Sequence, residues 1–231
     1  MRLKLICCEI FMRVACLAIA KSPHTIDPVF IKITSHNVPA DLNKQIQQII
    51  DESQAQRYDA ILLCMGLCGN AMIGIRSRNT PLIIPRAHDC CTILLGSSEK
   101  FIKYFSHRLS APWTSICYKE RKKIDDEFNK LVEKYGKEDA LYIWETMYKS
   151  DAVDTEIYIS CPEIEDETYI KKIIEDAEKE GKTIEVLEGD SRLIFDLING
   201  NWNENEFLIV RPAEEIIGEY DYKKVFSTKT Y

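Results

Sequence analysis

Apolar residues in the first part of the chain recur at the spacings of strands and amphipathic helices. The runs Leu3–Ile6 and Val29–Ile33 predict two strands, and apolar residues at i, i+4, i+7 and i+8 predict a packed helix over Ala40–Ser53. The unbroken apolar run Asp59–Met65 indicates a central parallel strand, because such strands are covered on both faces. Pro81–Ile84 predicts a further short strand.

The rest of the chain continues this alternation. A helical pattern starts at Ile124, breaks at Gly136 and resumes through Trp144. After it, the pattern predicts in order the strand Glu156–Ser160, the helix Glu165–Lys179, the strand Thr183–Leu187, the helix Ser191–Ile198 and the strand Phe207–Val210. We therefore expect an α/β fold with mainly parallel sheets and flanking helices. Two similar Rossmann-like lobes fit this layout: an N-terminal α/β lobe over residues 1–118, a helical connector over 119–150 and a C-terminal α/β lobe over 151–231.

Composition and charge exclude some classes of partner. With 231 residues, 45% of them hydrophobic, the chain is long enough to bury a substantial core. Its net charge of -7 gives no electrostatic footprint for nucleic acid. The apolar run Leu5–Ala20 is interrupted by Glu9 and Arg13, and no segment reaches the roughly 18 apolar residues that span a bilayer. We expect a cytoplasmic protein without a membrane or nucleic-acid partner.

Nine cysteines make thiol chemistry the main candidate for function. In a reducing cytosol, free thiols are structural, metal-binding or catalytic. Three predicted strand ends carry them, and ligands of open α/β sheets bind outside the carboxyl ends of strands. Thiolates with imidazole suit soft or borderline metals, so the sequence predicts a metal ion or iron–sulfur cluster. The predicted ligands are Cys8, Cys68, Cys90 and His88.

The other cysteines are open or structural. Cys16 and Cys117 fit the role of small core residues, and Cys161 fits either class. The sequence does not decide whether the three remaining thiols join the site: Cys7, Cys64 and Cys91.

His88 and Asp89 also fit a site without metal, in which His88 deprotonates Cys90 or Cys68. Residues adjacent in sequence seldom have the geometry in which one acts as a base and the other orients it. The ordinary alternative is a histidine that hydrogen-bonds a backbone carbonyl beside a helix-capping aspartate. Asp89 or Thr92 can supply that cap.

Arg86, Glu9 and two glycines are candidates for binding a cofactor or an anion. Arg86 either pairs with Glu9, grips an anionic ligand or makes a plain structural ion pair. The spacing of Gly66, Gly69 and Gly74 matches neither common phosphate-loop motif, so we expect a tight turn with positive φ beside the site.

Several motifs resemble the domain of unknown function 1638 family over most of the chain. They are C-C-E from Cys7, H-N-V-P-A-D-L from His36, G-L-C-G from Gly66, P-R-A-H-D-C from Pro85, and the later segments G-D-S-R-L and F-L-I-V-R-P. The family pattern has a glycine where Cys64 stands and often an aromatic residue where Met65 stands. The family positions carried over are Cys8, Glu9, Cys68, Arg86, His88, Asp89 and Cys90.

The resemblance implies anaerobic metabolism, because members of this family accompany corrinoid-dependent methyltransferase genes. The leading hypothesis is therefore a metal- or iron–sulfur-binding protein that supports one-carbon (corrinoid-dependent methyl transfer) metabolism. A corrinoid protein or a methyltransferase is the expected partner. Two other hypotheses stay open: a metal-free enzyme with a cysteine nucleophile and His88 as base, and a noncatalytic partner of a methyltransferase or corrinoid protein.

Overall fold

The computed structural model has a five-stranded sheet at its centre, and it describes residues 1–108, 111–124, 127–148, 155–179, 181–219, 221 and 223–231. The strand order is β2-β1-β3-β4-β8, with the first four strands parallel and β8 antiparallel to β4. Their bounds are β1 Arg2–Cys8, β2 Thr25–Ile31, β3 Ala60–Cys64, β4 Leu82–Pro85 and β8 Phe207–Val210. The predicted α/β class with mainly parallel sheets is confirmed.

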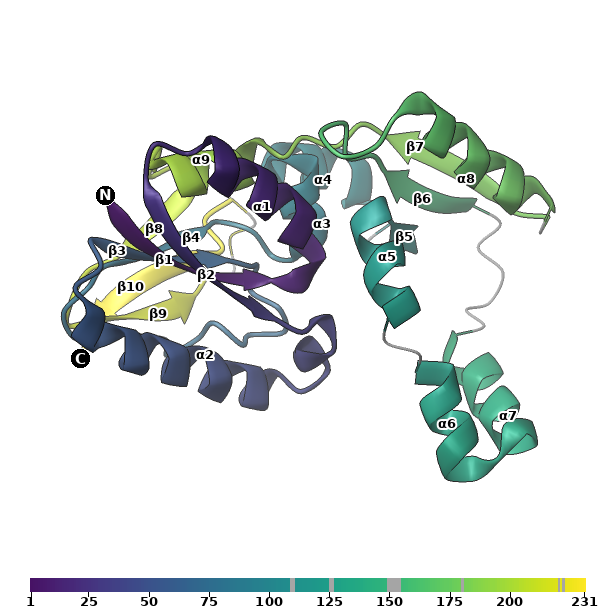
Figure 1. Ribbon diagram of the computed structural model, residues 1–231, viewed down its shortest axis with the longest axis horizontal. Helices are drawn as coiled ribbons and strands as arrows, with labels where there is room; N and C mark the ends of the chain where they lie inside the picture. The colour runs from purple at the N-terminus through teal and green to yellow at the C-terminus, as the bar shows by residue number, and fades with distance from the viewer. Residues whose placement is uncertain (109–110, 125–126, 149–154, 180, 220, 222) are drawn as a thin grey trace.

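Both faces of this sheet are covered (Figure 1). Helices α1 (Met12–Lys21) and α9 (Arg192–Asn199) pack on one face. Helix α2 (Pro39–Ser53) and the hairpin of β9 (Glu214–Gly218) and β10 (Phe226–Thr230) pack on the other. Strand side chains alternate between faces, so Leu5 and Cys7 of β1 join the first core cluster while Ile6 joins the second.

The direction of the crossovers reverses between β1 and β3. From β1 the chain crosses to β2 at the sheet edge, and from β2 it returns past β1 to β3. Such a topological switch point opens a crevice at the carboxyl ends of the two strands, where ligands of this fold type bind. Short helical segments follow these ends: η1 (Glu9–Phe11) after β1, η2 (Ile33–Asn37) after β2, and α3 (Cys90–Leu95) with α4 (Ser98–Phe105) after β4; η3 (Gln54–Gln56) instead leads into β3.

A second, smaller sheet packs beside the first (Figure 1). Its order is β5-β6-β7, all parallel, with α5 and α8 alongside, and the hairpin of α6 and α7 projects away from both sheets. The amide of Asp190 donates to the carbonyl of Leu94 at 2.8 Å, and Ile157 and Ile159 join the same core cluster as β1. The bounds are β5 Trp113–Thr114, α5 Ile116–Ile124, α6 Glu127–Tyr135, α7 Lys137–Tyr148, β6 Thr155–Ile159, α8 Glu167–Lys179 and β7 Thr183–Leu187.

Strand β8 belongs to a different sheet from the one predicted. The sequence assigns Phe207–Val210 to a C-terminal lobe, but it pairs antiparallel with β4 and completes the first sheet. Its four residues are buried or half-buried on both faces, so they fit a sheet of either lobe, and only the partner strand decides. The proposed boundary between residues 150 and 151 lies outside the described residues, and the division into lobes stays a prediction.

The apolar run Leu5–Ala20 divides into the end of β1, the η1 turn and most of α1. Glu9 and Arg13, which interrupt the run, both make polar contacts at the surface of the core. In the part of the chain that the structure describes, no helix is long and apolar enough to cross a membrane.

Candidate functional site

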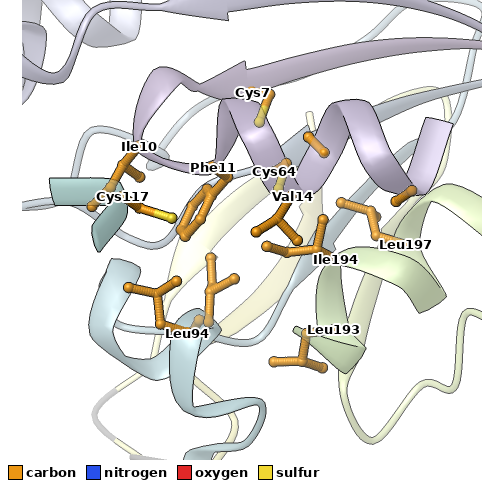
Figure 2. Packing of buried hydrophobic residues seen from close by; sticks show 14 of the residues in the cluster. Cys7, Ile10, Phe11, Val14, Cys64, Leu94, Cys117, Leu193, Ile194 and Leu197 are labelled. Carbon is orange, nitrogen blue, oxygen red and sulfur yellow. The ribbon is translucent and has the colours of Figure 1, made fainter. Parts of the chain in front are cut away.

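The six cysteines at the carboxyl ends of β1, β3 and β4 fall into two sets of three. The first set is fully buried in the core beside α1, and Figure 2 shows two of its members packed with Val14. The second set is partly exposed. The alternation of side chains along a strand separates Cys7 from Cys8, and one step along α3 separates Cys90 from Cys91. The buried set is Cys7, Cys64 and Cys91, and the partly exposed set is Cys8, Cys68 and Cys90.

The loops that follow β3 and β4 are held together by their backbones. The amide of Leu67 donates to the carbonyl of Ala87 at 2.9 Å, and the amide of Cys68 donates to the carbonyl of His88 at 3.2 Å. A Cβ atom at Gly66 would lie 2.7 Å from Cα of Asp89, closer than real Cβ atoms approach backbone. Glycine at this position therefore lets the loop carrying Cys68 rest on the loop carrying His88.

Cys68 lies in a left-handed turn. Its φ is 47°, and those of Gly69 and Asn70 are 65° and 72°. A left-handed backbone is unfavourable for a residue with a Cβ by about 1–2 kcal/mol, and such residues cluster at functional sites. The prediction of positive φ is confirmed for Gly69 and for Gly74, whose φ is 78°. For Gly66 it is wrong, because that glycine is required by the close approach of Asp89 instead.

The three partly exposed thiols lie near enough for their charges to interact. The pKa of Cys8 is raised to about 12: burial is the largest cause, a hydrogen bond with the backbone of Ile10 opposes it, and the charge of Cys68 adds to the rise. Burial likewise raises the pKa of Cys68 to about 11. The pKa of Cys90 is raised well above its ordinary value by burial, then by the charges of Asp89, Cys8 and Cys68. All three side chains are therefore protonated thiols at neutral pH when nothing cationic is bound.

Asp89 is the N-cap of α3. Its Oδ1 accepts from the amide of Thr92 at 2.9 Å and from the Thr92 hydroxyl at 3.0 Å. The prediction that Asp89 can cap this helix is confirmed. Burial lowers the pKa of the neighbouring His88, against the opposing charge of Asp89, so His88 is mainly neutral at pH 7. A catalytic role for these two residues stays a prediction.

Glu9 fastens the end of β1 to two other elements. Its Oε1 accepts from the amide of Ile33 at 2.7 Å, and its Oε2 lies 4.0 Å from Nη1 of Arg121 in α5. Both carboxylate oxygens thus have structural contacts beside Cys8, and a contact of Glu9 with a cofactor stays a prediction.

Arg86 is directed to the C-terminal hairpin. Its guanidinium donates to the carbonyls of Glu204 at 3.0 Å, Lys224 at 2.8 Å and Phe226 at 2.5 Å. The alternative in which Arg86 pairs with Glu9 is wrong, because each side chain serves a different element. Arg86 also lines a cavity of about 810 Å³ at the end of β4, and a role in gripping an anionic ligand stays a prediction.

Sulfur and imidazole nitrogen atoms are suitable ligands for a soft cation, but these side chains do not form a complete metal site in the structure. Within the described ranges, no group of three or more His, Cys, Asp or Glu side chains is arranged to hold a metal ion. Thiols from Cys8, Cys68 and Cys90 supply sulfur ligands, and neutral His88 supplies the form of imidazole that binds metals.

A further thiol pair lies in the core without any signal in the sequence. The sulfur atoms of Cys117 and Cys161 lie 3.8 Å apart in the core. Cys117 follows the two-residue strand β5, which is too short to leave a hydrophobic pattern, so no signal in the sequence indicated that both cysteines follow neighbouring strands.

The fold is that of a doubly wound α/β protein, and three partly buried cysteines follow its strands β1, β3 and β4 near the switch point. The sequence model of the family described as protein of unknown function (DUF1638) matches residues 30–198, and the chain belongs to this family. The matched region includes Cys68, His88 and Cys90, while Cys8 and Glu9 precede it. Searches of curated proteins and of solved structures found no significant match.

Proposed function

We propose that Cys8, Cys68 and Cys90 bind a soft metal ion or an iron–sulfur cluster at the switch point of the first sheet. The observation that carries this proposal is that three adjacent strands each place one partly buried cysteine at or after their carboxyl ends, while the neighbours Cys7 and Cys91 turn into the core. Cysteines that only fill the core would not need one of two neighbouring thiols to stay outside it.

The thiol pKas favour a cation over a nucleophile at this site. Reactive cysteine nucleophiles have lowered pKas, because a nearby positive charge stabilises the thiolate. Here burial raises the pKas of Cys8 and Cys68. A bound metal cation supplies the missing positive charge and replaces the thiol protons.

Binding would have to bring the sulfur atoms closer than they lie now. Cys68 lies in a left-handed turn, and Cys90 is the first residue of α3. Because both residues adjoin loops, a small shift of either loop changes the sulfur positions without moving a strand. Three thiolates would leave one iron of a cluster, or one position of a single metal, for His88 or an exogenous ligand.

The link to corrinoid-dependent methyl transfer rests on the family resemblance alone. It names the kind of reaction in which such a metal would act, with a corrinoid protein or methyltransferase as partner. The site itself supports only the narrower proposal of thiolate metal binding.

The test is the metal content and ultraviolet–visible spectrum of protein purified without oxygen. A cluster gives broad absorption near about 400 nm and bound iron, whereas a single zinc ion gives metal without colour. A metal-free protein with one hyper-reactive thiol would point to the cysteine nucleophile with His88 as base. A metal-free protein with ordinary thiols would point to a noncatalytic partner, and either result would remove the metal proposal.

The variant His88→Ala separates two roles for the histidine. If His88 is a ligand, the variant loses metal; if it is a proton donor, the variant keeps its metal. Circular dichroism of the variant confirms that it remains folded.

A further inference from the structure

The thiols of Cys117 and Cys161 form a second sulfur site that is separate from the first. Their sulfur atoms lie 3.8 Å apart, although 44 positions separate the residues in sequence. Cys117 is in the first turn of α5, after β5, and Cys161 follows β6, the strand paired with β5. Both side chains are almost completely buried, and Cys117 lies beside Ile10 and Phe11 (Figure 2).

Hydrogen bonds within the two turns that carry Cys117 and Cys161 hold this pair in place. The carbonyl of Cys161 accepts from the amides of Ile164 at 3.0 Å and Glu165 at 3.2 Å. The carboxylate of Glu165 in turn accepts from the amide of Cys161 and from the hydroxyl of the buried Tyr158. On the other side, the hydroxyl of Ser115 accepts from the amide of Tyr118 at 3.2 Å in the first turn of α5. The two sulfur atoms therefore face each other because both turns are fixed.

A cavity lies beside the two turns that carry the pair. It has a volume of about 990 Å³ and is lined by Ile116 and Pro162, each the sequence neighbour of one of the two cysteines. Cys16 of α1 lines the same cavity, and the prediction that it is a small core residue is wrong, because its position on α1 faces outward and leaves it exposed. A small oxidant in this cavity thus meets the sequence neighbours of both cysteines.

We propose that Cys117 and Cys161 are a redox site, at which a hydroperoxide converts the two thiols into a disulfide. Hydrogen bonding to Cys117 and burial raise the pKa of Cys161, so Cys161 stays protonated and Cys117 is the thiol that reacts first. Cys117, as its thiolate, attacks the peroxide oxygen and becomes a sulfenic acid; the O–O bond breaks, and with hydrogen peroxide the leaving group departs as water. The second thiol attacks that sulfur and releases another water, so two thiols and one hydrogen peroxide give one disulfide and two waters. The sulfur atoms must approach by roughly 1.8 Å to reach the bond length of about 2.0 Å.

The disulfide would fasten the start of α5 to the end of β6. From α5, Arg121 reaches both Glu9, at 4.0 Å, and the sulfur of Met12, at 3.3 Å. Oxidation of the pair therefore fixes the helix that supports the residue next to Cys8.

The experiment oxidises the metal-free full-length chain with one equivalent of hydrogen peroxide and maps the peptides by mass spectrometry. We expect a cross-linked peptide pair joining Cys117 to Cys161, its loss on reduction with dithiothreitol, and a higher melting temperature for the oxidised chain. The Cys16→Ser variant serves as the matched control, and we expect it to form the same cross-link.

Recovery of Cys117 and Cys161 as free thiols, under conditions that oxidise Cys16, would overturn the proposal. Because this result comes from the wild-type chain, it does not depend on the folding of a variant. The Cys117→Ala variant should then lack the cross-link and the rise in melting temperature while keeping its secondary structure by circular dichroism. A rise in melting temperature that persists in this variant would also contradict the assignment.

Discussion

At Gly66 the absence of a side chain allows two loops of the thiol site to touch. We expect Gly66→Ala to lower the free energy of unfolding by about 3 kcal/mol, because the new Cβ would lie 2.7 Å from the backbone of Asp89. The displaced loop should also expose Cys68, so its alkylation rate should rise. Urea unfolding and timed alkylation with mass spectrometry measure the two effects.

Gly74 is the matched control for this change. Its φ is +78°, and a Cβ there would meet nothing within 4 Å, so Gly74→Ala adds only backbone strain of about 1 kcal/mol. Its Cys68 alkylation rate should equal that of the wild type. Equal effects of the two substitutions on Cys68 would show that the contact with Asp89 does not hold the site together.

At the residue scale, the sequence predicted which cysteines lie at strand ends, but it did not predict which side chains point into the core. Cys7 and Cys8 are equivalent in composition, and only the pleat of β1 decides which one enters the core. Similarly, the role of Arg86 depends on the carbonyls of Lys224 and Phe226, which lie about 140 residues further along the chain. No local pattern contains that information.

At the scale of elements, Arg86 joins the loop after β4 to the C-terminal hairpin. We expect Arg86→Gln to destabilise the chain by about 2–3 kcal/mol, because hydrogen bonds to three carbonyls depend on its guanidinium. Amide hydrogen exchange in β10 should accelerate before exchange in β1 does.

Arg76 is the control, because it contacts the same hairpin from an exposed position. Its Nη1 lies 3.9 Å from the Glu215 carboxylate, and we expect Arg76→Gln to change stability by less than about 1 kcal/mol. If both arginine variants lose stability equally, Arg86 is an ordinary surface residue and its assigned role is wrong.

The predicted elements are those with a strong local period. The spacing of Leu42, Ile46 and Ile50 predicted α2, and the unbroken run in β3 predicted a buried strand. The hairpin of β9 and β10 has no such signal, because Glu214 and Glu215 begin β9 and no short turn motif joins it to β10. The helices α1 and α4 were missed as well, α1 because the apolar run from β1 continues into it without a break.

At the scale of the whole molecule, the raised pKas of Cys8 and Cys68 make stability depend on alkaline pH. The pKas of Cys8 and Cys68 are about 12 and about 11 in the folded chain, above the value of about 8.5 for an exposed thiol. The unfolded chain therefore loses these protons first. Their contribution is fully present below about pH 8.5 and is lost as the pH rises through about 11 to 12, with each thiol contributing about 1–2 kcal/mol of the decline by pH 10.

Urea unfolding of the metal-free, reduced chain at pH 7, 9 and 10 measures this decline. In the double variant Cys8→Ser/Cys68→Ser, the slope with pH should become shallower, since two of the contributing thiols are gone. A wild-type stability that stays constant between pH 8 and 10 would contradict the raised pKas of these thiols.

The central claim is that Cys8, Cys68 and Cys90 bind metal as one unit, and anaerobic reconstitution of single variants tests it most directly. Metal is counted per chain in the wild type, in Cys8→Ser, Cys68→Ser and Cys90→Ser, and in Cys16→Ser as the control, with circular dichroism confirming folding. We expect each of the three site variants to lose most of the metal and the control to keep it. Glu9→Gln, which changes a residue beside the ligands, should weaken binding by only about 10- to 100-fold. Equal metal content in the wild type and all three site variants would contradict the account.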